Sequence, residues 1–134
     1  MAHPDLLQRL RQTLAGRADV RVAVLFGSEA RGTARPDSDV DVAVDAPGVD
    51  LLDLRAQLSC ALDREVDVVA LEEASIPLHE ALIHDGVVVH EGYPGAGALW
   101  RSRTLAMLET DRPWYARMRD AWLTRVKEKG FARG

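Results

Sequence analysis

Two aspartates in the first half of the chain have the spacing of a metal site. Asp39 and Asp41 flank Val40 at the start of an apolar run, and ten residues separate Asp39 from the pair Gly27-Ser28. Side chains two apart on a strand point to the same face, roughly 6–7 Å from each other, so these carboxylates would stand side by side. Mg²⁺ prefers such oxygen ligands and keeps phosphates and water in its shell. The pattern therefore predicts a magnesium site that faces a phosphorylated substrate.

The Gly27-Ser28 pair has the features of a phosphate site. It follows the apolar run VAVLF, where a strand would turn into the start of a helix. Backbone N–H groups at such a turn, together with the serine hydroxyl, can hold a phosphate. Nucleotidyl transfer needs charge neutralisation and in-line placement more than covalent help. A phosphate site beside a metal site therefore predicts nucleotidyl transfer, with Gly27 and Ser28 on the triphosphate.

A third carboxylate usually completes a site for two metal ions, and it can accept the proton of the nucleophile. Asp67 is the candidate, because it lies within the apolar run VDVV, where an uncompensated charge would be costly. Glu65 would share its face of the strand and is the main competitor. Arg31 lies in the loop between the Gly-Ser pair and the aspartates, where it could contact nucleotide phosphates or pair with an acid.

The pattern Gly-Ser, ten residues, then Asp-x-Asp resembles the signature of the polymerase-beta-type nucleotidyltransferases. The resemblance covers about residues 6–91. The short length and lone catalytic module are similar to the minimal nucleotidyltransferases, and among these to the MntA-type antitoxins encoded beside HEPN-domain toxins. The resemblance implies an α/β fold, with a small mixed sheet flanked by helices. It also implies a third carboxylate on a following strand, where Asp67 lies, and a basic residue at the place of Arg31.

The resemblance further implies a Mg²⁺-dependent protein adenylyltransferase with ATP as substrate. Such an antitoxin would transfer AMP to a tyrosine hydroxyl of a partner HEPN ribonuclease toxin and so silence it. Two alternatives stay open. The chain could be a binding antitoxin that acts by stoichiometric contact. It could also be a small-molecule nucleotidyltransferase of the aminoglycoside type, although those enzymes generally carry a larger acceptor domain than the 36 residues after position 98 would supply.

Hydrophobic spacing predicts strands that alternate with helices. The expected strands cover residues 20–26, 40–44, 65–71 and 86–90. The expected helices are an N-terminal helix stopped by Gly16, a helix over 50–63, and one capped by Ser75. Residues 92–97 hold three glycines and a proline and predict a hinge. Beyond it we expect two helices, about 98–110 and 113–128, parted by Asp111-Arg112-Pro113. The chain would thus comprise a core over 1–92 and a tail over 98–134, the tail being part of the same domain or a partner-docking extension.

Charge divides the chain into an acidic core and a basic tail. Residues 1–98 hold 8 Lys/Arg against 17 Asp/Glu, whereas residues 99–134 hold 9 against 4. This asymmetry argues against direct nucleic-acid binding by the whole chain, and points to the tail as the contact for an acidic partner or for phosphates. A solvated helical face is the alternative. Trp114, Met118 and Trp122 recur every four residues, a pattern typical of core packing. We expect the core to be complete before residue 92, so a protein partner is the alternative.

Composition limits the remaining classes of protein. A hydrophobic content of 47% over 134 residues favours one folded domain. No apolar run approaches the roughly 18–20 residues needed to span a bilayer, and the N-terminus lacks a signal-peptide apolar region. The single cysteine, Cys60, excludes an internal disulfide framework, so the cytoplasm is the expected compartment. We expect Cys60 to be packed rather than reactive, and the absence of a Cys/His cluster argues against a zinc site.

Overall fold

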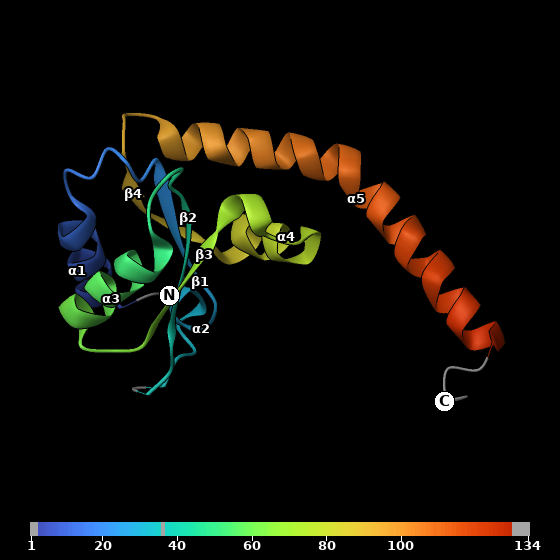
Figure 1. Ribbon diagram of the computed structural model, residues 1–134, viewed down its shortest axis with the longest axis horizontal. Helices are drawn as coiled ribbons and strands as arrows, with labels where there is room; N and C mark the ends of the chain where they lie inside the picture. Colours follow the sequence, from blue (N-terminus) through green and yellow to red (C-terminus); the bar gives the residue numbers. More distant parts are fainter. Residues whose placement is uncertain (1–2, 36, 130–134) are drawn as a thin grey trace.

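A four-stranded mixed sheet forms the centre of the molecule (Figure 1). The computed structural model describes residues 3–35 and 37–129, without the side chains of 112–115 and 126–129. The strand order is β3-β2-β1-β4; β1 runs antiparallel to β2 and β4, and β2 and β3 run parallel. The predicted mixed α/β sheet is thereby confirmed. The strands are β1 (Val22–Phe26), β2 (Val40–Asp45), β3 (Val66–Ala70) and β4 (Val87–Glu91).

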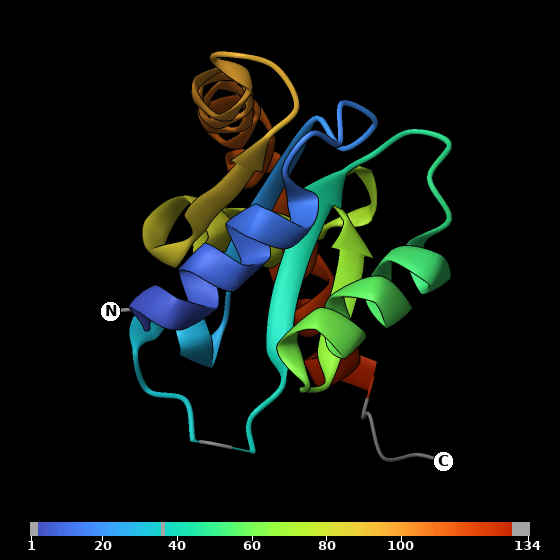
Figure 2. The ribbon, with the colours of Figure 1, turned by 90° about the vertical axis from the view of Figure 1, so that its left-hand side faces the viewer.

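Helices cover both faces of the sheet. Helices α1 and α3 lie on one face (Figure 2), and their leucines pack with Val40, Val42 and Val44 into the larger core cluster. Helices α4 and α5 lie on the other face, where Leu82 and Trp100 join a second cluster. The helices are α1 (Pro4–Leu14), α2 (Ser28–Arg31), α3 (Leu51–Leu62), α4 (Ile76–Asp85) and α5 (Ala96–Lys129), with a short 3₁₀ turn η1 (Leu71–Glu73).

Side-chain caps set where two of these helices begin. The carboxylate of Asp50 accepts hydrogen bonds from the N–H groups of Leu52 and Asp53 at the start of α3. The hydroxyl of Ser75 accepts from the N–H of Leu78 at the start of α4. Each cap satisfies backbone donors that the first turn of a helix leaves without partners. The predicted cap at Ser75 is therefore confirmed.

The C-terminal segment is one helix, and the prediction of two helices is wrong. Helix α5 runs without a break from Ala96 to Lys129, so Pro113 lies in its interior. Figure 1 shows α5 changing direction partway along its length. Proline removes one backbone hydrogen bond and crowds the preceding turn, which can bend a helix without ending it. The helix propensity of the residues on both sides of Asp111-Arg112-Pro113 thus outweighs its tendency to form a turn.

The first half of α5 belongs to the core, so the expectation that the core is complete before residue 92 is also wrong. Ala96, Thr104 and Leu108 are buried, and Trp100 packs against the cluster that contains Leu82. The expected hinge starts as a fixed turn, because the N–H of Gly92 donates to the carbonyl of Arg21 at 2.8 Å. The first turns of α5 therefore complete the layer that α4 begins on this face of the sheet.

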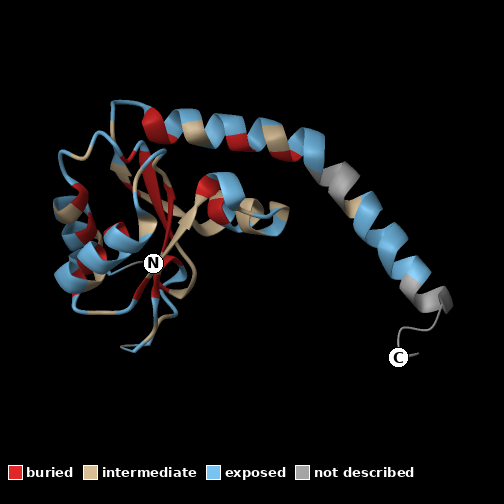
Figure 3. Cartoon of the chain, in the orientation of Figure 1, coloured by how far each residue is buried: buried red, intermediate tan, exposed pale blue. Residues whose placement is uncertain are grey.

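The second half of α5 extends away from the sheet (Figure 3). All side chains described over residues 117–125 are exposed. Met118 and Trp122 are 49% and 50% exposed, and Leu123 beside them is 49% exposed. The side chain of Trp114, the third member of the predicted stripe, lies outside the described residues. Met118 and Trp122 of the stripe are therefore not packed in the core.

Cys60 is exposed, contrary to the expectation that it is packed. Leu54, Leu58 and Leu62 form the buried stripe of α3. Position 60 falls between two residues of that stripe and therefore on the opposite side of the helix, which faces solvent. None of the helices in the described part of the chain is long and apolar enough to cross a membrane.

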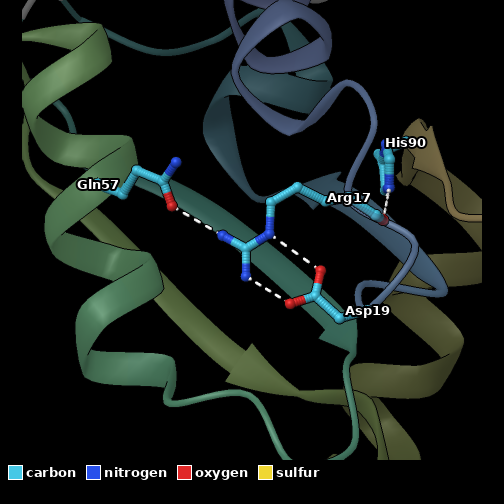
Figure 4. Close-up of polar contacts among 4 residues, drawn as sticks. All are labelled: Arg17, Asp19, Gln57 and His90. Carbon is cyan, nitrogen blue, oxygen red and sulfur yellow. Dashed lines mark hydrogen bonds and ion pairs between the residues drawn. The ribbon is translucent and has the colours of Figure 1, made fainter.

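Arg17 joins three elements at the end of β1 that is far from Gly27 (Figure 4). Its guanidinium forms an ion pair with Asp19 at 2.9 Å and donates to the side-chain oxygen of Gln57 on α3 at 2.8 Å. Its carbonyl accepts a hydrogen bond from Nε2 of His90 on β4 at 2.9 Å. These contacts fix the loop between α1 and β1, and they serve below as a control remote from the candidate site.

Candidate active site

The predicted phosphate turn, Gly27-Ser28, lies where β1 ends and α2 begins. Gly27 adopts φ +77°, in the region that residues with a Cβ rarely occupy. A Cβ at this position would lie 2.5 Å from Oδ2 of Asp41, which is closer than van der Waals contact allows. Glycine is therefore required here by the backbone conformation and by the carboxylate beside it.

The sheet brings the three predicted carboxylates to one end. Asp41 on β2 is paired in register with Phe26 at the end of β1 and with Asp67 on β3. Asp39 precedes β2 and shares the face of Asp41 by alternation. Ala43 of the same series belongs to the cluster under α4 and α5, so the carboxylates lie on that face. Gly27 and the three aspartates thus come together although they belong to three separate segments of the chain.

The electrostatics of Asp41 indicate a place for a cation. Burial raises the pKa of its carboxyl, and the negative charges of Asp67 and Asp39 raise that pKa further. The positive charge of Arg31 lowers the same pKa, which places Arg31 close to the carboxylates. A bound cation would relieve the repulsion among the three acids. Contact of Arg31 with a nucleotide phosphate stays a prediction.

An arginine is close to the third carboxylate. Nη2 of Arg55 on α3 lies 3.7 Å from Asp67 Oδ1 and 3.7 Å from Glu65 Oε2. Within the described ranges, no three His, Cys, Asp or Glu side chains converge closely enough to hold a metal ion as they stand. The donor set nevertheless fits Mg²⁺, because all its ligands are carboxylate oxygens on adjacent strands. Glu65 is more exposed than Asp67, and only Asp67 is level with Asp41. The register therefore favours Asp67 as the third ligand, which stays a prediction.

Two residues next to the site were missed by the sequence analysis. Glu29 directly follows Ser28 and is 6% exposed. Its carboxylate pairs with Nη1 of Arg64 at 2.5 Å, and Nη2 of the same arginine donates to the carbonyl of Ser38, which precedes Asp39. Neither residue belongs to the spacing pattern, and their segments are distant in the sequence. The sequence therefore offered no signal that could have found this pair.

The raised pKa of Asp41 makes a prediction about stability. A carboxyl whose pKa is raised on folding contributes stability that is fully present below its unfolded value and lost as the pH rises through its folded value. At pH 7 the ionised Asp41 therefore destabilises the metal-free fold. We expect Asp41→Asn to raise the melting temperature at pH 7 in EDTA, and this gain to shrink towards pH 4 and below. Thermal denaturation by circular dichroism checks this, and an equal gain at both pH values would contradict it.

Comparisons with known proteins agree with this geometry. The 73-residue stretch similar to "Protein adenylyltransferase MntA" of Shewanella oneidensis is 38% identical to it and covers 50% of this chain and 51% of that relative, so the match spans about half of the relative's length. A crystal structure of a toxin-antitoxin with AMP-PNP superposes with TM-score 0.68 and 26% identity, over 87% of this chain and 98% of that one. A crystal structure of a mutant of the toxin-antitoxin MntA-HpeT superposes with TM-score 0.63 and 25% identity, over 88% of this chain and 96% of that one. The family "Polymerase beta, Nucleotidyltransferase" matches residues 8–92. The chain therefore belongs to the polymerase beta nucleotidyltransferase family.

Proposed function

We propose that the chain is a Mg²⁺-dependent protein adenylyltransferase antitoxin. It would transfer AMP from ATP to a tyrosine hydroxyl of a HEPN ribonuclease toxin and so neutralise the toxin. The observation that carries the proposal is the register of Asp41 with Asp67, beside a glycine turn that leaves no room for a side chain. The similarity to a protein adenylyltransferase and to a toxin-antitoxin crystallised with an ATP analogue supports the choice of reaction and partner.

Each site residue has a role in this proposal. Gly27 and Ser28 would hold the triphosphate, and Arg31 would contact it. Asp39, Asp41 and Asp67 would hold two Mg²⁺ ions, which when bound supply charge neutralisation for the phosphates and the reacting oxygens. Asp67 would also accept the proton of the attacking hydroxyl. The tyrosine oxygen would bond to the α-phosphorus as the bond to the β-phosphate oxygen breaks, so pyrophosphate leaves.

The exposed half of α5 is the proposed docking surface for the toxin. Met118, Trp122 and Leu123 expose large apolar side chains there, and Arg117 and Arg125 are exposed among them. Exposed aromatic side chains with arginines are typical of protein interfaces. A helix segment that does not pack on its own core gains little from propensity alone, so a partner that covers it would stabilise it. The proposed surface would bring the toxin to the side of the molecule on which the carboxylates lie.

A binding antitoxin without chemistry is the second candidate. It is favoured by the ion pair between Asp67 Oδ1 and Arg55 Nη2 at 3.7 Å, because the positive charge of Arg55 opposes a second cation at Asp67. Under that candidate, contact through α5 alone would silence the toxin. The two candidates differ in whether protection of cells requires Asp67.

Loss of chemistry and loss of docking are expected to differ in kind. Asp67→Asn should bind the toxin with native affinity but fail to add AMP to it. Met118→Ser combined with Trp122→Ser should weaken binding by at least about tenfold, because interface aromatics often contribute 2 kcal/mol or more. Co-purification, intact mass of the toxin and rescue of cells from the toxin measure the three effects. Truncation before Leu99 is unsuitable, because it would remove the buried Leu108 and expose the core.

Leu52→Ser is the matched control for the docking variant. Leu52 is 75% exposed and lies on α3, in the layer on the other side of the sheet. It should leave binding and modification unchanged. If Asp67→Asn, shown to be inactive, protects cells as well as the native chain at equal expression, the binding candidate holds and the enzymatic account of protection is wrong.

A further inference from the structure

Arg64 connects the two halves of the candidate site. It lies between α3 and β3, and its guanidinium contacts two segments at once. Nη1 pairs with the carboxylate of Glu29, the residue after Ser28, at 2.5 Å. Nη2 donates to the carbonyl of Ser38, the residue before Asp39, also at 2.5 Å. The arginine therefore touches the immediate neighbours of the phosphate turn and of the first carboxylate.

The loop between these two segments does not hold them together by itself. In its described parts, backbone N–H groups bond within the loop or return to α2. Thr33 N–H donates to the Ser28 carbonyl, and Ser38 N–H donates to the Arg35 carbonyl. Arg35 N–H donates back to the Ser38 hydroxyl. Arg64, by contrast, bonds to the segments at both ends of the loop.

The ion pair between Glu29 and Arg64 is not explained by a contribution to folding stability. The Glu29 side chain is 8% exposed and that of Arg64 24%. Removing two charges from water costs about as much as their attraction returns, so apolar residues of similar volume often serve stability as well. In the described structure, Nε of Arg64 is in addition buried without a hydrogen-bond partner. The planar guanidinium instead supplies two donors in a rigid fork, which fixes how far apart Glu29 and the Ser38 carbonyl lie.

We propose that Arg64 is a positioning residue that sets the separation between the phosphate turn and Asp39. The inference rests on the proposed function for the roles of Ser28 and Asp39. Phosphate and metal are parts of one Mg²⁺–ATP complex, so the two sites bind it together only if their separation matches. A misplacement of about 1 Å can cost about 10²-fold in such a site. Glu29 has the same positioning role, because its ion pair with Arg64 connects α2 to the guanidinium.

The test replaces both charged partners together. Arg64→Ala alone would leave Glu29 buried without its partner and could unfold the protein. Glu29→Leu with Arg64→Met removes the connection and leaves no unpaired charge, so its melting temperature should stay near the native one. We expect its affinity for ATP without Mg²⁺ to change less than about twofold, because the phosphate turn itself is intact. The gain in ATP affinity on adding Mg²⁺ should fall at least about tenfold, as misplacement of two joined sites predicts.

Controls separate positioning from general destabilisation. Arg17→Met with Asp19→Asn removes an arginine of equal exposure, 25%, whose contacts lie at the other end of β1 (Figure 4). It should keep the native Mg²⁺ gain. Arg64→Lys with native Glu29 keeps the charge but has no rigid fork to reach both partners. Its gain in ATP affinity on adding Mg²⁺ should lie between that of the native protein and that of the Glu29→Leu/Arg64→Met variant. Displacement of a fluorescent ATP analogue, with and without Mg²⁺, measures all four proteins.

Two outcomes overturn the inference. One is a native Mg²⁺ gain in the Glu29→Leu/Arg64→Met variant. The other is an equal loss of ATP affinity with and without Mg²⁺, which a merely structural role would produce. A native protein that binds ATP equally with and without Mg²⁺, or not at all, contradicts the proposed function instead, so the two failures are distinguishable.

Discussion

Asp41→Asn is expected to abolish AMP transfer, lowering its rate by at least about 10³-fold, since Mg²⁺-assisted charge stabilisation contributes several kcal/mol and each 1.4 kcal/mol is about tenfold. Asp41 is half-buried, lies beside Gly27 and is level with Asp67, so it is central among the three predicted carboxylates. Asparagine keeps the shape but lacks the negative charge that Mg²⁺ requires. Mass spectrometry of a co-expressed toxin, in which one AMP adds a known increment, measures transfer.

The same strand supplies a matched control. Asp45 shares the parity of Asp39 and Asp41 but lies at the other end of β2, level with Val22. Its carboxylate is exposed, and Nη1 of Arg21 lies 4.0 Å from its Oδ2. Because Asp45 lies at the far end of the strand, we expect it to have no part in the site. Asp39→Asn should be as inactive as Asp41→Asn, whereas Asp45→Asn should transfer normally. Full transfer by either of the first two variants would show that these aspartates do not hold a catalytic metal.

Gly27→Val is expected to have the second largest effect, a loss of ATP affinity of at least about 100-fold, or about 2.7 kcal/mol. Valine is strained at φ +77°, and its Cβ would lie 2.5 Å from Oδ2 of Asp41. The substitution would therefore block the approach of phosphate to the backbone and also displace a metal ligand. Ser28→Ala should cost about tenfold, at the lower end of the roughly 1.5–3 kcal/mol that one hydrogen bond to a charged group contributes, because the backbone N–H groups of the turn remain. Calorimetric titration with ATP in Mg²⁺ measures both.

Gly48→Val separates backbone strain from the effect on the site. Gly48 has φ +78°, but a Cβ there meets no atom within 4 Å. It lies in the turn after β2, so its variant carries the same kind of strain away from the phosphate turn. We expect Gly48→Val to bind ATP normally. If Gly27→Val binds ATP as well as Gly48→Val does, the turn at Gly27 is not the phosphate site.

The sequence by itself determined the parts of the site that depend on local periodicity. Strand alternation requires Asp39 and Asp41 to share a face wherever the strand lies, and the strand-to-turn change at Gly27 follows from the end of an apolar run. The predicted strands agree with β1 to β4 to within about two residues at each end. These features need no knowledge of neighbouring elements, because each follows from residues adjacent in the chain.

Only the tertiary structure decided which distant residues meet. The parallel register places Asp67 level with Asp41, and parity alone could not choose between Asp67 and Glu65. Glu29 and Arg64 meet because the fold brings α2 to the connection between α3 and β3, and no spacing pattern links them. Helix α5 continues through Pro113 for a similar reason. Helix formers flank the proline, and the segment before it packs against α4 and the sheet, so tertiary burial outweighs a local turn signal.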